Sequence, residues 1–149
     1  MNRVNIKHTL AFAALLGASV GASALDVNNG YVFGDSLSDN GNLRAFAGDP
    51  SLPERFTNGA VAVEITAAQA GWVLTPSLHL IPGMPHGNNY ATATATAIDE
   101  DGDEATVDLN LPSQVNAFLQ YNGFTAPTDA LYSFIIGTGD VESSIKMRL

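Results

Sequence analysis

One serine of this chain stands where an enzyme would present a nucleophile. Ser36 lies in the run YVFGDSLSDNGN, residues 31–42, in which an apolar segment breaks at a glycine into a polar loop. A strand would hold the backbone rigid, Gly34 would allow a sharp bend, and the hydroxyl would be exposed at the carboxyl end of the strand. The alternative is a turn serine that satisfies nearby backbone groups. The surrounding residues favour the nucleophile.

The motif resembles the GDSL, or SGNH, family of serine ester hydrolases. Gly-Asp-Ser-Leu at residues 34–37 is followed by Ser-Asp-Asn-Gly-Asn at residues 38–42, which matches the lipase-like branch of that family. The resemblance implies a flavodoxin-like three-layer α/β sandwich with a parallel sheet. It also implies that Ser36 is the nucleophile and that its backbone N–H is one oxyanion donor. Asp35 is expected to brace the turn through backbone hydrogen bonds rather than to transfer a proton.

Two further motifs of the family are altered in this chain. The resemblance implies an oxyanion donor from a Gly-Gly pair after an Asn-Tyr-Ala run, but after residues 89–91 the glycine positions hold Ala93 and Thr94. A backbone N–H survives there, while the added Cβ opposes the orientations that glycine allows. The third motif is Gly-x-Asn-Asp, and residues 137–140, GTGD, place Gly139 where the family has the donor Asn. Losing one such donor typically costs about 2.7–4 kcal/mol of transition-state stabilisation.

The general base is the largest gap. The family draws it from an Asp-x-x-His motif near the end of its domain. No such motif occurs in this sequence, which has only residues 141–149 after the third motif. His8 lies in the expected leader, and His79 and His86 lie in a proline-rich connection. Either of these two is a candidate base for Ser36, but loop histidines are more often plain surface residues. The sequence therefore predicts a nucleophile without an identified base.

Local patterns predict the elements that position these motifs. Residues 30–33 form a short buried strand before the serine loop, and the run RFTNG, residues 55–59, opens a helix that Gly71 ends. Asn58 is the expected N-cap of that helix. Its buried face is expected to hold three residues at helical spacing, Val61, Ile65 and Ala68.

Later segments continue the alternation of strands and helices. Residues 72–74 are a candidate short strand, a second helix starts at Pro112 and Ser113 and stops at residues 122–123, and a strand covers residues 131–136. This order predicts an α/β fold on a parallel sheet, truncated after its third strand. An uncovered last strand predicts poor solubility or self-association. The second helix carries an apolar stripe of Leu111, Val115, Phe118 and Leu119.

Residues 1–24 are expected to be a signal peptide. Arg3 and Lys7 precede the mostly apolar residues 9–20, and the small-x-small site ASA ends at Ala24. A membrane anchor is the alternative, but this apolar run is too short for a bilayer core, which needs about 20 residues. Residues 25–149 are then the N-terminal portion of a GDSL hydrolase domain, secreted or periplasmic, with no stable membrane span.

Composition excludes several partners and chemistries. The chain has 15 acidic residues and a formal net charge of −9, so nucleic acid is not an expected partner. Zero cysteines exclude disulfides, zinc-thiolate sites and a cysteine nucleophile. The acidic run DEDGDE at residues 99–104 is either a calcium loop or a solvated loop. Its spacing fails the EF-hand test, because Gly102 is fourth instead of sixth and Asn110 takes the place of the closing Glu. No cofactor and no metal are expected.

Two function classes remain. The first is a secreted GDSL-type hydrolase of ester bonds with Ser36 as nucleophile, incomplete and weakly active or inactive as this chain. The second is a non-catalytic secreted protein of the same fold that binds an ester, lipid or glycan without turning it over. The expected ligand is a small-molecule or lipid ester. Relatives of this fold cleave small acyl esters, phospholipids and acetylated sugars, so the sequence leaves the ester open.

Overall fold

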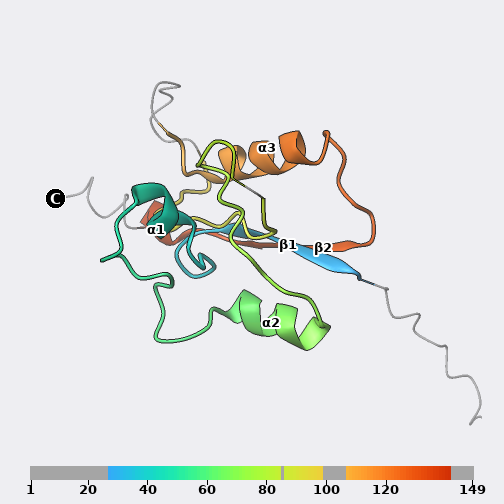
Figure 1. Ribbon diagram of the computed structural model, residues 1–149, viewed down its shortest axis with the longest axis horizontal. Coiled ribbons are helices and arrows are strands. Elements are labelled where there is room, and N and C mark those ends of the chain that lie inside the picture. The colour runs from blue at the N-terminus through green and yellow to red at the C-terminus, as the bar shows by residue number, and fades with distance from the viewer. Residues whose placement is uncertain (1–26, 85, 99–106, 142–149) are drawn as a thin grey trace, which may run out of the picture.

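A computed structural model describes residues 27–84, 86–98 and 107–141 of the chain (Figure 1). The expected signal peptide, residues 1–24, and the acidic run 99–104 lie outside the described residues, so cleavage after Ala24 and the calcium alternative stay predictions. No helix in the described ranges is long and apolar enough to cross a membrane. The elements are β1 (Asn29–Gly34), α1 (Asn42–Ala47), α2 (Ala62–Ala70), α3 (Leu111–Tyr121) and β2 (Ala130–Ile135).

The two strands form a small parallel sheet. β1 and β2 pair with each other along their whole lengths. On its other edge β1 contacts the segment around Asn88, because Val32 N donates to Asn88 O (3.0 Å) and Tyr90 N donates to Val32 O (2.7 Å). β1 therefore has backbone partners on both sides. The predicted strands at residues 30–33 and 131–136 are confirmed.

The predicted strand at residues 72–74 is wrong. The Trp72 ring packs closely against Gly30 at the beginning of β1, and the chain around it has no regular structure. Backbone pairing begins only after this segment, where the Thr75 carbonyl accepts a hydrogen bond from Asn89 N (2.9 Å). The described residues therefore contain a sheet of two strands instead of the three expected.

Helices cover both faces of this sheet (Figure 1). On one face Val63 and Ala67 of α2 pack in a cluster with Val32 of β1. On the other face Phe118 of α3 packs against Phe33, with the ring centroids 5.5 Å apart. The chain is therefore an α/β protein with a parallel sheet between helices, as predicted. The full three-layer flavodoxin-like sandwich and its truncation stay predictions.

Helix α2 begins later than predicted. Val61, not Asn58, is its N-cap, and the Glu64 carboxylate accepts a hydrogen bond from Val61 N (3.0 Å). This contact gives the N-cap backbone N–H a partner. Gly71 ends the helix in a left-handed conformation, with φ 84°, as predicted.

The buried face of α2 also differs from the predicted one. Val61 is buried as expected, but Ile65 is 51% exposed and Ala68 is exposed. Val63 and Ala67, one helical turn apart, face the sheet instead. The predicted stripe was counted from Val61, which precedes the helix and has extended backbone, so the helical spacing did not apply to it.

Helix α3 has the predicted start, stop and stripe. Pro112 lies in its first turn, and the Asn110 side chain caps it by accepting a hydrogen bond from Ser113 N (2.9 Å). Asn122 is the C-cap. The stripe packs as one cluster in which Phe118 is buried and Leu111, Val115 and Leu119 are partly buried.

Candidate functional site

The carboxylate of Asp35 fastens the serine turn to the end of β2. Asp35 is buried, and its Oδ2 accepts hydrogen bonds from Gly137 N (3.0 Å) and Thr138 N (2.9 Å). Its Oδ1 accepts from Leu37 N (3.1 Å). Hydrogen bonds to an ionised carboxylate are stronger than those between neutral groups. Asp35 therefore braces the turn, as predicted, and joins it to the third motif at residues 137–140.

Ser36 lies where the chain comes to the surface. Asp35 before it is buried, Ser36 is half-buried, Leu37 after it is 50% exposed, and Ser38 is buried again. Within the described ranges, no side chain or backbone group forms a hydrogen bond with the Ser36 hydroxyl. The structure thus places Ser36 directly after the carboxyl end of β1, where the sequence predicts it.

The last residue of β1 is held by a side chain of α3. Gln114 is fully buried, its Oε1 accepts a hydrogen bond from Gly34 N (2.9 Å), and its Nε2 donates to Gly34 O (2.9 Å). Gly34 O also accepts from Thr92 N (3.0 Å). A Cβ added at Gly34 would lie 2.0 Å from Ile135 O, so only glycine fits. The turn that carries Ser36 therefore leaves the sheet from a fixed point.

A second buried carboxylate joins the serine loop to the second motif. Asp39 is fully buried, and its Oδ1 accepts hydrogen bonds from Gly41 N (2.8 Å) and Asn42 N (2.7 Å) at the beginning of α1. Its Oδ2 accepts from Leu43 N (3.1 Å) and from Ala93 N (2.8 Å), far along the chain. One side chain therefore caps α1 and holds the segment that contains the second motif.

The two positions that carry glycine in the family behave differently. The Ala93 N–H is taken by the Asp39 carboxylate, so in this structure it points to a buried acceptor. Thr94 is exposed and has φ 71°, a left-handed conformation that glycine adopts freely and that a branched residue adopts at a cost of about 1–2 kcal/mol. The turn keeps a glycine-like backbone at Thr94 despite its Cβ.

The third motif packs directly on this turn. A Cβ added at Gly139 would lie 2.6 Å from Ala95 O and 3.1 Å from Thr94 O, so an Asn at this position would require the backbone to move. The next residue, Asp140, accepts a hydrogen bond from Ala97 N (3.0 Å). Together with Asp35 and Asp39, these contacts bring the three motifs into one cluster at the carboxyl ends of the strands.

The described structure pairs neither loop histidine with Ser36. His86 lines a hollow together with Asn29, the first residue of β1, whereas Ser36 follows the last. A strand of this length spans roughly 17–20 Å. The Nδ1 of His79 pairs with the Ser77 hydroxyl (2.7 Å). That neither histidine is the base stays a prediction.

Acid is expected to destabilise the chain through His79. Burial, with the neighbouring His86 imidazole, lowers the pKa of His79 to about 4, below its ordinary 6.5. The unfolded chain therefore takes up a proton below about pH 6.5 that the folded chain does not, so stability falls as the pH drops from 6.5 towards 4. Between about pH 6.5 and 5 the expected loss in the free energy of unfolding is about 2 kcal/mol.

Urea unfolding of the chain and of His79→Gln across this pH range measures the effect. The variant is expected to lose most of the pH dependence. An equally steep decline in the variant would show that another group is responsible.

Comparison with known proteins agrees with this arrangement. The profile of the family described as GDSL-like Lipase/Acylhydrolase matches residues 31–147. The chain belongs to this family. Lipase 1 of Photorhabdus luminescens is 30% identical to this GDSL chain over 144 residues, which cover 95% of the chain and 20% of that protein. The chain thus spans about a fifth of the length of this relative.

The sequence analysis missed two residues that tie the GDSL motifs together. Gln114 carried a signal, because it lies beside Val115 on the apolar stripe of α3, where a polar side chain needs a buried partner. Asp39 lies inside the GDSL loop, but its contact with Ala93 joins positions far apart in sequence. No local pattern reveals such a contact.

Proposed function

We propose that this chain is the N-terminal part of an exported serine ester hydrolase with Ser36 as its nucleophile. The observation that carries the proposal is the turn, braced by Asp35, that leaves a half-buried Ser36 at the carboxyl end of β1. In the proposed reaction Ser36 Oγ bonds to the ester carbonyl carbon as a base takes the hydroxyl proton, and the alcohol leaves with that proton as its C–O bond breaks. Water then attacks the acyl-serine ester, the acid leaves, and the Ser36 hydroxyl is restored. The Ser36 N–H is one donor to the oxyanion. Membership of a family of lipases and acylhydrolases supports ester hydrolysis as the reaction class.

The proposal places the general base outside this sequence. The sequence contains no Asp-x-x-His, and His79 Nδ1 pairs with Ser77 in the described structure. A serine hydroxyl without a base is a weak nucleophile at neutral pH. Because the chain matches only 20% of Lipase 1, a longer protein of this kind has room for the missing group. The chain alone is proposed to be weakly active or inactive on an ester whose class stays open.

A non-catalytic binding protein is the second candidate, and the state of the oxyanion donors favours it. The Ala93 N–H is already bonded to Asp39, and Gly139 has no side chain to donate and no room for one. An open hollow of about 590 Å³ beside the serine loop, lined in part by Gly41, Arg44 and Leu78, offers a place for a ligand. In this candidate Ser36 is a remnant of an ancestral enzyme.

Covalent capture of Ser36 separates the two candidates. A fluorophosphonate forms a P–O bond with an accessible serine hydroxyl while the P–F bond breaks, and fluoride leaves as the hydroxyl proton passes to solvent. We expect a slow adduct on Ser36, located by peptide mass spectrometry, because the turn presents this hydroxyl although the base is absent. Intact mass of the exported sample is expected to show Leu25 as the first residue.

The matched control is Ser38→Ala, in the same loop. Ser38 is buried, and its hydroxyl has no partner within the described residues, so this variant is expected to label like the unaltered chain. Ser36→Ala is expected to take no label. A chain that takes no label at all would favour the non-catalytic candidate, and a sample that retains residues 9–20 would contradict export with cleavage.

A further inference from the structure

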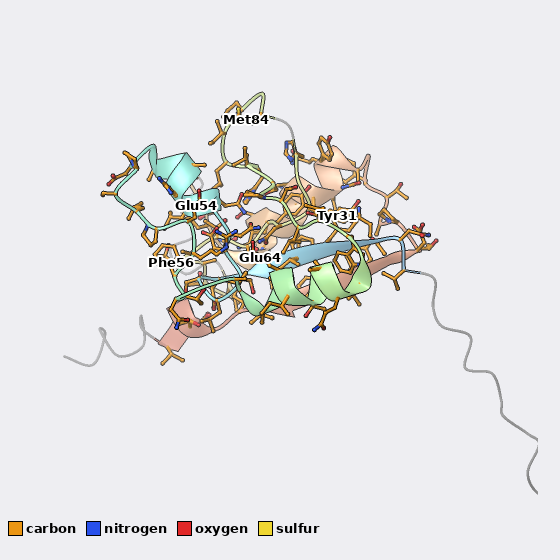
Figure 2. All side chains as sticks on the ribbon, turned by 60° about the horizontal axis from the view of Figure 1, so that its bottom comes forward. Tyr31, Glu54, Phe56, Glu64 and Met84 are labelled. Atoms are coloured by element: carbon orange, nitrogen blue, oxygen red, sulfur yellow. The ribbon has the colours of Figure 1, made fainter. Side chains whose placement is uncertain are left out.

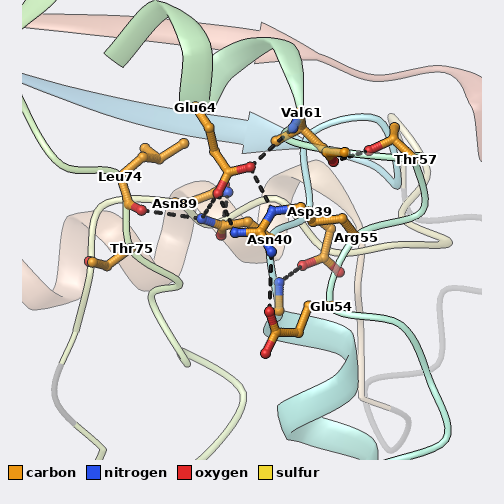
Figure 3. A network of polar contacts seen from close by, with 12 residues as sticks. Asp39, Asn40, Glu54, Arg55, Thr57, Val61, Glu64, Leu74, Thr75 and Asn89 are labelled. Atoms are coloured by element: carbon orange, nitrogen blue, oxygen red, sulfur yellow. Dashed lines mark hydrogen bonds and ion pairs between the residues drawn. The ribbon is translucent and has the colours of Figure 1, made fainter. Parts of the chain in front are cut away.

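Arg55 and Glu64 form an ion pair next to Asn40, which belongs to the GDSL loop (Figure 3). Arg55 donates from Nε to Glu64 Oε2 and from Nη2 to Glu64 Oε1, both at 2.7 Å. This two-pronged contact fixes the plane of the carboxylate. The hydrogen bonds from the Arg55 guanidinium lower the pKa of Glu64 despite its partial burial, so the carboxylate stays ionised and accepts hydrogen bonds only. In Figure 2 Glu64 stands at the beginning of α2, which starts after Val61.

The Glu64 carboxylate sets the orientation of a buried amide. Asn40 Nδ2 faces two acceptors, Glu64 Oε1 (3.4 Å) and Leu74 O (3.3 Å). Because both neighbours accept, the NH₂ group of Asn40 must point to them and its Oδ1 must point the other way. That oxygen accepts a hydrogen bond from Asn89 Nδ2 (2.7 Å).

The orientation of Asn40 in turn fixes that of Asn89, which is fully buried. Its Nδ2 also donates to Ser38 O (2.7 Å), and its Oδ1 accepts from Ala91 N (3.0 Å). One amide therefore holds the carbonyl two residues after Ser36 and, at the same time, the segment that leads into the second motif. Reversal of this amide would place its oxygen against the Ser38 carbonyl oxygen and its NH₂ group against Ala91 N–H.

We propose that Arg55 and Glu64 are positioning residues for the nucleophile turn. They act through the amide of Asn40, which Glu64 holds together with the Leu74 carbonyl, and through Asn89 on the Ser38 carbonyl. The inference rests on the proposed function, because it is the placement of Ser36 that the network serves. It assigns a role to the Arg of the RFTNG run, which otherwise has no part in the chemistry.

The test substitutes Glu64→Gln, which keeps the shape and replaces one acceptor with a donor. In ¹⁵N-labelled chain, the side-chain amide signals of Asn40 and Asn89 are expected to shift. Hydrogen exchange at the Ser38 and Ala91 amides is expected to accelerate about tenfold, as loss of one buried hydrogen bond allows. Labelling of Ser36 by the fluorophosphonate is expected to slow by a similar factor. Arg55→Lys, which keeps the charge but not the paired contact, is expected to give a smaller change of the same kind.

The matched control is Glu54→Gln. Glu54 also pairs with Arg55 (3.1 Å), but its side chain is 58% exposed and forms no hydrogen bond with Asn40 within the described residues. Its substitution is expected to leave the Asn89 signals and the Ser38 exchange rate unchanged.

Three results overturn the inference. The first is unchanged Asn89 signals in a folded Glu64→Gln chain. The second is exchange that rises throughout α2 but not at Ser38, which would mean a merely structural role. The third applies if Glu64→Gln does not fold, and it is an Arg55→Lys chain whose Asn89 signals are unchanged. If the unaltered chain takes no fluorophosphonate label, only the assignment of Ser36 as nucleophile is contradicted. The coupling between Glu64 and Ser38 is measured by amide signals and hydrogen exchange, which do not need the label.

Discussion

Replacing Gly34 with alanine is expected to lower the free energy of unfolding by about 4 kcal/mol or more. A Cβ at this position would lie 2.0 Å from Ile135 O, a backbone atom that cannot rotate away. Relief would require β1 and β2 to separate at the point where they pair. The bonds from Gly34 to Gln114 would be lost as well, and with them the anchor of the turn that carries Ser36.

Urea unfolding compares Gly34→Ala with Gly59→Ala. Gly59 has nothing within 4 Å of the position where a Cβ would lie, so its substitution is expected to change stability little. Equal unfolding midpoints for the two variants would show that the close approach of the two strands does not exist in solution.

Asp39→Ala is expected to lower the free energy of unfolding by about 3 kcal/mol or more. The substitution leaves four backbone N–H groups without their acceptor, those of Gly41, Asn42, Leu43 and Ala93. An unsatisfied buried donor typically costs about 1–3 kcal/mol, and water can replace the acceptor only at the more open positions. The second motif would also lose its direct tie to the serine loop.

The control for Asp39 is Asp49→Ala. Asp49 is exposed, and within the described residues its carboxylate accepts one backbone hydrogen bond, from Ser51 N (2.8 Å). Its removal is expected to cost little, as is usual for a surface residue. A loss for Asp39→Ala no larger than that for Asp49→Ala would contradict the linking role of Asp39.

Local signals predicted the parts of the fold that depend on local physics. The strand before the serine, the capped helix after Asn110 and its stripe around Phe118 each follow from neighbouring residues. The bracing role of Asp35 was also predictable, because its carboxylate closes a turn with Leu37. The GDSL resemblance then supplied the reaction class.

The remaining features depend on partners far away in the sequence. The segment around Trp72 has strand-like composition, yet its ring packs on Gly30 and its backbone does not join the sheet. Packing against β1, and not the spacing of apolar residues along the sequence, determines which face of α2 is buried. Likewise, the role of Asp39 in holding Ala93 appears only when the chain is folded.

Hydrolysis of p-nitrophenyl esters by the unaltered chain most directly tests whether Ser36 is a nucleophile that lacks its base. We expect a rate barely above background, well below the roughly 10³–10⁴-fold over water that binding and a well-formed oxyanion hole sustain without a complete triad. Ser36→Ala should bring this rate to background, and His79→Gln and His86→Gln should leave it unchanged. Robust turnover that is lost in Ser36→Ala and in one histidine variant would show that the base lies within this chain, and turnover that survives Ser36→Ala would remove Ser36 from the reaction.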